Sequence, residues 1–191
     1  EGRHSVSDDL TVLQGLPPEF APIRTLGAGG FGAVYLAEQT TVGRKVAVKV
    51  LLSAHATEKK HVDRFLQEAT VLAKLKHQNI VTVFTAGTLD SGVPYIVMDF
   101  LDGEPLSARL RDGVPMGTDE ALDIMEQIAE GLGAAHELGV IHRDIKPDNI
   151  MLVTEGRKTV VKLLDFGIAK LKDSEVVRTG AAEAFFTPTY M

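Results

Sequence analysis

Four short motifs contain the residues whose types and spacing could carry out chemistry. In chain order they are a glycine-rich turn (GAGGFG, 27–32), a strand lysine (VAVK, 46–49), a polar run (HRDIKPDN, 142–149) and the tripeptide DFG (165–167). Each motif alone could arise by chance. Together, in this order, they supply every part that is needed to hold Mg-ATP and to pass its γ-phosphoryl group to a hydroxyl.

The glycine-rich turn fits the pattern G-x-G-x-x-G, which is a weak signal by itself because dinucleotide-binding folds carry the same letters. A dinucleotide fingerprint must open a helix, whereas the residues after Gly32 alternate as a strand. We therefore expect the turn to join two antiparallel strands, where glycines let backbone N–H groups approach phosphate oxygens. A plain glycine hairpin is the alternative for this motif alone. The residues of the turn are Gly27, Ala28, Gly29, Gly30, Phe31 and Gly32.

Lys49 lies in the middle of a predicted strand, where a solvent-facing lysine is the ordinary interpretation. Glu68 favours a different one, because on a helical wheel it falls inside the apolar arc, between Leu72 and Leu75. A buried carboxylate is costly unless it is paired. We expect Lys49 to be its partner, with the pair aiming the ammonium at the α- and β-phosphates. The alternative is that Glu68 lies at the edge of the apolar arc and reaches solvent.

The chain resembles a protein kinase from about residue 23 to its end, and it looks most similar to bacterial serine/threonine kinases of the eukaryotic-like (Hanks) type. The run at 142–149 is the strongest part of this resemblance. It matches the pattern H-R-D-L-x-x-x-N, with Ile145 in place of Leu. The alternative, a polar loop with incidental letters, requires the other three motifs to be coincidences as well.

The resemblance implies a role for each polar residue of the later motifs. Asp144 would accept or orient the proton of the substrate hydroxyl, and Lys146 would contact the γ-phosphate, as in serine/threonine kinases. Asn149 and Asp165 would hold Mg²⁺, since two protein oxygen ligands with phosphates and waters suit this ion. Lys49 and Glu68 join Asp144 and Lys146 in the predicted catalytic set.

The remaining nucleotide contacts also follow from the resemblance. Leu26, Val34 and Ala47 would cover the adenine from above, and Met151 would cover it from below. Met98 would be the gatekeeper, the backbone from Asp99 to Leu101 would bind the adenine edge, and Glu104 would reach the ribose. For each apolar residue the alternative is ordinary core.

The segment after DFG resembles an activation loop. Arg143, beside Asp144, is typical of kinases that are switched on by phosphorylation of this loop, where a phosphate would pair with the arginine. Ser174 and Thr179 are candidate sites of autophosphorylation, and Thr179 is preferred; an unchanged activity in Thr179→Ala would exclude it as the switch. Phe186 stands where the family usually has Gly, which affects the expected local loop geometry.

The elements that must position these motifs form an α+β pattern. Alternating runs predict five antiparallel strands with one helix, followed by helices and two short strands, which is a two-lobed kinase-like fold with a mostly helical second lobe. The predicted strands are 23–26, 33–38, 45–51, 80–86, 95–100, 150–153 and 160–164, and the predicted helices are 58–76, 105–111 and 119–138.

The predicted domain organisation has one break. Residues 1–19 are expected to be a leader, loose over 1–14, and 20–191 a partial kinase domain. Within it, 20–100 would be the N-lobe, 101–103 a hinge, and 101–191 the first part of the C-lobe through the activation loop. Since family kinases are longer, we expect this stretch alone to be poorly stable and weak or inactive as an enzyme.

Composition limits the functional classes. The chain has 191 residues, 45% of them hydrophobic, which is enough for a real core, and its formal net charge of -6 argues against a general nucleic-acid binder. There are no cysteines, so no disulfide or thiolate metal site contributes. No apolar stretch approaches the ~20 residues that span a bilayer, and no signal peptide is evident, so a cytoplasmic location is expected.

The predicted function is ATP-dependent phosphorylation of Ser or Thr in protein substrates by a signalling kinase. The alternative is a pseudokinase that binds nucleotide, or nothing, and acts through protein contacts. The presence of Lys49, Glu68, Asp144, Asn149 and Asp165 argues against it, because a scaffold has no chemical need for all five. A small-molecule kinase is a third hypothesis, but such enzymes usually lack the Lys-Pro pattern and DFG.

Overall fold

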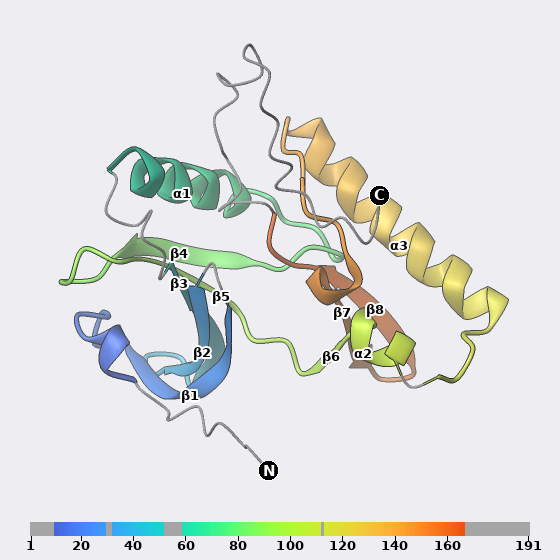
Figure 1. The fold of residues 1–191 in the computed structure, drawn as a ribbon, viewed down its shortest axis with the longest axis horizontal. Helices are drawn as coiled ribbons and strands as arrows, with labels where there is room; N and C mark the ends of the chain where they lie inside the picture. The colour runs from blue at the N-terminus through green and yellow to red at the C-terminus, as the bar shows by residue number, and fades with distance from the viewer. Residues whose placement is uncertain (1–9, 30–31, 52–58, 112, 167–191) are drawn as a thin grey trace. The chain divides into compact units, whose positions relative to one another are not determined.

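The computed structural model describes residues 10–29, 32–51, 59–111 and 113–166 (Figure 1). These residues divide into two compact units. Unit 1 takes the chain up to residue 74 and residues 82–100, and unit 2 takes residues 75–81 and everything from residue 101. The predictions for several residues therefore fall outside the described part of the chain: 1–9 of the leader, Gly30 and Phe31 of the turn, Gly167 of DFG, both candidate phosphorylation sites, and Phe186.

Unit 1 contains a five-stranded antiparallel sheet, as predicted, and its strand order is β1-β2-β3-β5-β4. The first two strands pair up to Gly29 and Gly32, so the glycine-rich turn joins antiparallel strands and does not open a helix. This pairing excludes the dinucleotide-binding interpretation. The strands are β1 (Phe20–Gly29), β2 (Gly32–Gln39), β3 (Arg44–Val50), β4 (Val83–Thr88) and β5 (Pro94–Asp99).

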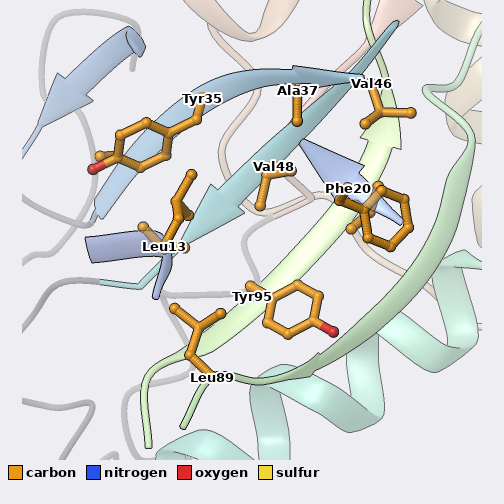
Figure 2. Packing of buried hydrophobic residues seen from close by; sticks show 11 residues of the cluster. Leu13, Phe20, Tyr35, Ala37, Val46, Val48, Leu89 and Tyr95 are labelled. Carbon is orange, nitrogen blue, oxygen red and sulfur yellow. The ribbon is translucent and has the colours of Figure 1, made fainter. Parts of the chain in front are cut away.

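The side chains of the central strands alternate between the two faces of this sheet. One face is filled by a buried cluster, which includes Tyr35 of β2, Val48 of β3 and Tyr95 of β5 (Figure 2). The opposite face carries the even-numbered residues of β2 and the odd-numbered residues of β3. Val34 and Lys49 are therefore placed on that opposite face, where they are direct cross-strand partners.

The helix of unit 1, α1 (Lys59–Leu72), packs against β4 and β5 through buried residues that include Phe65, Ala69 and Leu72. It ends earlier than the predicted 76. After Leu72 the chain continues in a turn, with the N–H of Lys74 donating to the carbonyl of Val71. The helix propensity of the Lys-rich segment that follows is overridden because residues 75–81 belong to unit 2.

The expectation of a loose leader over 1–14 is wrong at its end. Residues Leu10–Leu13 form a short 3-10 helix, η1, and Leu13 is only 4% exposed. Leu13 belongs to the same buried cluster as Tyr35, Leu89 and Tyr95 (Figure 2). A four-residue helix gives no periodic signal in the sequence. These residues are ordered because they pack on the sheet face that carries the buried cluster.

Unit 2 is built on a three-stranded antiparallel sheet, with order β6-β7-β8, and on the long helix α3, which packs against β8. None of the described helices has the length and apolar character needed to cross a membrane. The elements are β6 (Gly103–Pro105), α2 (Leu106–Arg111), α3 (Thr118–Glu137), the 3-10 helix η3 (Pro147–Asn149), β7 (Ile150–Glu155) and β8 (Lys158–Leu163).

Two details of unit 2 differ from expectation. The predicted hinge at 101–103 runs directly into β6, a strand of three residues that is too short to be recognised in the sequence. Its Gly103 lies so close to the carbonyl of Leu152 that a Cβ would collide with it. The predicted strand 80–86 begins only at Val83. Ile80 forms instead an isolated parallel bridge with Leu163 of unit 2.

Candidate active site

The polar run at 142–149 follows the C-terminal end of α3. The helix stops at Gly139, whose φ of 72° suits a left-handed residue after a helix, and the N–H of Gly139 donates to the carbonyl of His136 at 2.9 Å. Four residues further on, Arg143 has a φ of 61°, which is uncommon for a residue with a side chain. Such strain persists only where surrounding contacts hold it, and it concentrates at functional sites.

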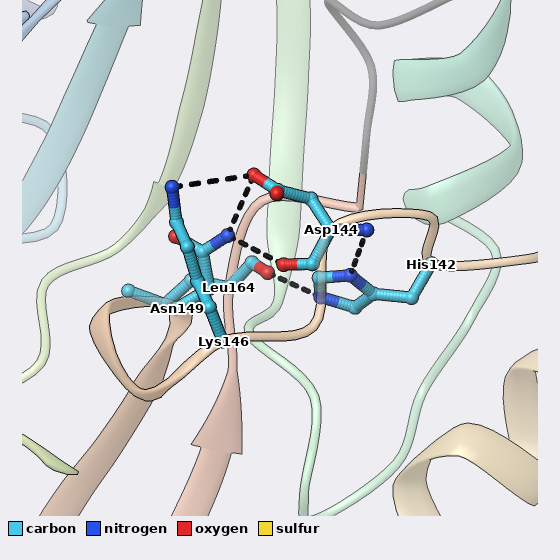
Figure 3. Close-up of polar contacts among 5 residues, drawn as sticks. All are labelled: His142, Asp144, Lys146, Asn149 and Leu164. Atoms are coloured by element: carbon cyan, nitrogen blue, oxygen red, sulfur yellow. Dashed lines mark hydrogen bonds and ion pairs between the residues drawn. The ribbon is translucent and has the colours of Figure 1, made fainter. Parts of the chain in front are cut away.

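His142 supplies the contacts that hold this turn. It is 2% exposed; its Nε2 lies 2.7 Å from the carbonyl oxygen of Leu164, and its Nδ1 accepts from the N–H of Asp144 at 3.3 Å (Figure 3). Because Nδ1 is an acceptor, the proton of the neutral ring is on Nε2. Burial lowers the pKa of His142, against smaller opposing effects of the Leu164 carbonyl, Asp144 and Asp165. The ring also lies against Phe166, with centroids 4.5 Å apart.

Asp144 is surrounded by the other polar residues of the run. The Nδ2 of Asn149 donates to both the backbone oxygen of Asp144, at 2.8 Å, and its Oδ2, at 3.1 Å. The Nζ of Lys146 lies 3.5 Å from the same Oδ2, as Figure 3 shows. Asn149 is 7% exposed, whereas the Asp144 side chain keeps 13% of its surface accessible. One carboxylate is thus oriented by a buried amide and a cation while one side stays open to a reactant.

Asp165 follows β8 at the place where the chain leaves the sheet. Its φ is 48°, the second left-handed value among the described residues that are not glycine. The preceding residue, Leu164, donates its N–H to the carbonyl of Asn149 at 2.9 Å. The backbone therefore holds the two predicted metal ligands, Asn149 and Asp165, on adjoining segments of unit 2.

The donor set of these two residues fits Mg²⁺. Asn149 uses its Nδ2 in two hydrogen bonds to Asp144, which leaves the amide oxygen as the group that can face a cation. Amide and carboxylate oxygens are hard ligands, and Mg²⁺ usually takes only one or two from a protein beside phosphates and waters. Within the described residues there is no group of three or more His, Cys, Asp or Glu side chains that could hold a metal by itself.

Several predicted nucleotide residues share one face of the sheet in unit 1. Val34 is the cross-strand partner of Lys49, and Ala47 is the partner of Met98. Leu26 lies on β1 and is 36% exposed, with its neighbour Gly27 paired to Val34. The sheet register therefore gathers these positions. The side chain of Glu68 lies outside the described part of the structure, so its pairing with Lys49 remains a prediction.

The remaining predicted contacts are dispersed along the chain. Asp99 ends β5, and its N–H donates to the carbonyl of Thr82 at 2.9 Å, so this N–H is already engaged within unit 1. Leu101 begins the stretch that belongs to unit 2. Glu104 lies exposed on β6, next to Pro105, which pairs with Met151 of β7.

Two buried polar residues of unit 2 are not singled out by the sequence motifs. One is His142, which the motif pattern contains but to which it assigns no contacts. The other is Asn79, which is fully buried; its Nδ2 donates to Gln127 Oε1 and to the carbonyl of Val161, each at 3.0 Å. A polar residue directly before the apolar pair Ile80 and Val81 was the available signal for a buried, hydrogen-bonded amide.

Comparison with known proteins places these features in a family. The family described as "Protein kinase domain" matches residues 20–191. The chain is 44% identical over 173 residues to serine/threonine-protein kinase Pkn1 of Myxococcus xanthus, covering 90% of this chain and 24% of that protein. It is 38% identical over 162 residues to PknA of Mycobacterium tuberculosis, covering 82% of this chain and 37% of that protein. The chain thus spans about a quarter to two fifths of the length of these relatives.

Solved structures agree with this placement. The crystal structure of the M. tuberculosis PknI kinase domain has a TM-score of 0.71 at 33% identity, with 82% of this chain and 63% of that chain covered. A structure of Rad53 in complex with AMP-PNP has a TM-score of 0.68 at 32% identity, with 78% of this chain and 38% of that chain covered. The two-lobed kinase-like fold expected from the sequence is confirmed.

Proposed function

Because this chain belongs to the protein kinase domain family, we propose that the protein containing it transfers the γ-phosphoryl group of ATP to serine and threonine hydroxyls of protein substrates, as a signalling kinase. The relatives that it resembles are named as serine/threonine-protein kinases, which supports the acceptor class. The single observation that carries the proposal is the arrangement of Asn149 and Lys146 around the Asp144 carboxylate.

In this proposal Asp144 orients the acceptor hydroxyl and takes its proton as the oxygen bonds to the γ-phosphorus, while the bond from the γ-phosphorus to the β,γ-bridging oxygen breaks and ADP leaves. The Nδ2 of Asn149 is held by the backbone carbonyl of Asp144 and donates to Oδ2 of the same residue, which orients the carboxylate, so it need not reorganise during the reaction. The ammonium of Lys146, 3.5 Å from Oδ2, is close enough to neutralise charge on the phosphoryl group being transferred. Catalysis then rests mainly on positioning and charge neutralisation, as in other phosphoryl transfers.

ATP is the proposed nucleotide. The shared face of β2, β3 and β5, with Val34, Ala47 and Met98, offers the apolar contacts, and Lys49 on the same face offers a cation for the phosphates. The related Rad53 structure contains AMP-PNP, an ATP analogue, which supports this nucleotide class. Glycines 27, 29, 30 and 32 would let backbone N–H groups approach the phosphates.

Mg²⁺ is the proposed metal, with Asn149 and Asp165 as its protein ligands. When bound, it would neutralise charge on the phosphates of the nucleotide. Autophosphorylation at Thr179 and a cytoplasmic location also stay predictions, since Thr179 lies outside the described residues.

The test is phosphate incorporation from labelled ATP and Mg²⁺ by the full-length natural protein, on itself and on a generic protein substrate. Asp144→Asn is expected to lower labelling of Ser and Thr by about 10²–10⁴-fold, the usual contribution of a positioned general base. Asp148→Asn is the matched control, because Asp148 carries the same charge on the exposed side of η3. It should label like the unsubstituted protein.

Two results would contradict the proposal. A folded unsubstituted protein without any labelling would favour the pseudokinase alternative, and nucleotide binding would then be measured by calorimetry. Equal labelling by the Asp144→Asn and Asp148→Asn proteins would show that the Asp144 carboxylate has no catalytic role.

A further inference from the structure

Residues 10–16, which we call the brace, cross the back of the sheet in unit 1. This segment precedes the region from residue 20 onward that matches the kinase family, so family membership assigns it no role. All its aliphatic side chains pack on the buried cluster of the sheet. Leu13 is a member of that cluster, and three others lie partly buried against it: Leu10, Val12 and Leu16.

The brace connects the two edges of the sheet. In the strand order β1-β2-β3-β5-β4, the edges are β1 and β4. At one end, the chain leads from the brace directly into β1, with the N–H of Phe20 bonded to the carbonyl of Pro17. Close to this same C-terminal end of the brace, Gly15 meets Asp90, in the turn that follows β4. A Cβ on Gly15 would lie 2.6 Å from both the Cγ and the backbone N of Asp90.

The conformation of the brace is defined by its own backbone. The N–H of Gln14 donates to the carbonyl of Thr11 at 3.1 Å, and that of Leu16 to the carbonyl of Leu13 at 3.0 Å. Gly15 has a φ of 86°, which other residues adopt only with strain. These features aim Leu13 at the sheet, where Tyr35, Leu89 and Tyr95 share its cluster (Figure 2).

The strands that the brace covers carry the proposed ATP contacts on their other face. Tyr35 and Val48 are cross-strand partners toward the brace, and their sequence neighbours Val34 and Lys49 are partners on the opposite face. Because one backbone carries both sets, a shift of Tyr35 or Val48 into a void left by Leu13 must also move Val34 and Lys49. Displacements of about 1 Å are enough to affect binding and catalysis.

We propose that the brace at residues 10–16 positions the nucleotide-binding face of the sheet, and that Leu13 and Gly15 are positioning residues for ATP. The proposal rests on the proposed kinase function. It predicts that loosening the brace raises KM for ATP while kcat at saturating ATP changes much less.

The experiment uses the full-length protein and compares three substitutions. Leu13→Ala removes the buried side chain, and Gly15→Ala disturbs the brace while leaving its apolar surface intact. Ile124→Ala is the matched control: Ile124 is 3% exposed and lies on α3, in unit 2. Hydrogen exchange of the β2 and β3 amides is measured without nucleotide, and KM for ATP and kcat are measured well below the melting temperature.

Both brace variants are expected to exchange faster in β2 and β3 and to raise KM for ATP roughly threefold or more, a typical size for coupling through packed networks. Ile124→Ala should lower the melting temperature without either effect. Unchanged hydrogen exchange in β2 and β3 of both brace variants would contradict the proposal that the brace holds the sheet, whatever the enzyme activity of these variants. Faster exchange with an unchanged KM for ATP would overturn its positioning role. An unsubstituted protein that fails to phosphorylate anything would contradict the proposed function, while hydrogen exchange would still decide whether the brace holds the sheet.

Discussion

His142 has no direct role in the proposed chemistry, yet it joins the turn that carries Asp144 to the strand end that carries Asp165. Its ring bonds the Leu164 carbonyl through Nε2 and the Asp144 N–H through Nδ1. Only the neutral ring can make both bonds, because a protonated Nδ1 would point a hydrogen at the Asp144 N–H. The buried imidazole therefore links the integrity of the site to its protonation state.

This linkage predicts how stability depends on pH. Burial lowers the pKa of His142 in the folded state below its ordinary value of 6.5, so the unfolded chain binds more protons between the two values. Its contribution to stability is complete above pH 6.5 and is lost as the pH falls below it. The slope for this one proton is at most about 1.4 kcal/mol per pH unit.

Urea unfolding between pH 5 and 8 (roughly the range in which histidines titrate) checks this prediction. His142→Gln should flatten the dependence, whereas His136→Gln, on the exposed end of α3, should keep it. An equally steep pH dependence in the His142→Gln protein would show that another group is responsible.

Residue patterns could indicate that Lys146 and Asn149 lie near the Asp144 carboxylate, because all three belong to one short run; their catalytic and metal-binding roles stay predictions. They could not predict how that set is held. One partner of His142, the Leu164 carbonyl, lies 22 residues away, and the partners of Asn79 lie 48 and 82 residues away. Separations of this size leave no local signal in the sequence. The pair of Lys49 and Glu68 stays a prediction.

At the level of elements, the glycine-rich hairpin contains two glycines with different requirements. Gly32 has a φ of 149°, and a Cβ there would collide with the carbonyl oxygen of Val50 on β3. Gly27 has open space where a Cβ would be. One glycine is therefore needed by the fold, while the other is free to serve a ligand.

Alanine at each position should separate these requirements. Gly32→Ala is expected to cost about 1–3 kcal/mol of stability, the usual range for a strained backbone position. Gly27→Ala should leave the free energy of unfolding unchanged and raise KM for ATP, since its added methyl group would face the proposed phosphate path. Thermal unfolding and steady-state kinetics measure the two effects. Equal stability losses in both proteins would contradict this division.

The predictability of the elements follows the same division between local and distant causes. The order of β1, β2 and β3 could be predicted because short turns connect alternating strands. The strand β6 and the helix η1 could not, since each is short and ordered by a surface made elsewhere in the chain: β7 for Gly103 and the back of the sheet for Leu13.

At the scale of the whole molecule, the chain passes between the units more than once, because residues 75–81 belong to unit 2 although unit 1 flanks them on both sides. This segment is anchored within unit 2. The N–H of Val81 donates to the carbonyl of Leu163 at 3.0 Å, the N–H of Leu163 donates to the carbonyl of Asn79 at 2.8 Å, and Ile80 is 1% exposed. A cut after Phe100 would therefore leave residues 75–81, which belong to unit 2, on the N-terminal fragment.

We expect that such a cut does not separate the fragments. A specific protease site inserted after Phe100 would allow the full-length protein to be nicked, and the two fragments should then elute together in size-exclusion chromatography until denaturant is added. Asn79→Ala removes the hydrogen bonds from the side-chain amide to Gln127 and Val161, and it should weaken the association of the fragments. Prompt separation of the nicked, unsubstituted protein would contradict the prediction.

The same interleaving has a consequence for synthesis on the ribosome. Asn79 emerges 48 residues before Gln127 and 82 residues before Val161, its two hydrogen-bond partners. At translation rates of about 5–20 residues per second, its buried amide waits roughly 4–16 s for the second of them. The five strands of unit 1 are all translated once β5 is complete, so the first unit can close while residues 75–81, with the apolar side chains of Leu75, Ile80 and Val81, still lack their native partners. Nascent chains arrested shortly after residue 127 should therefore present this segment to chaperones, and protection of residues 75–81 from proteolysis at that length would contradict this order of assembly.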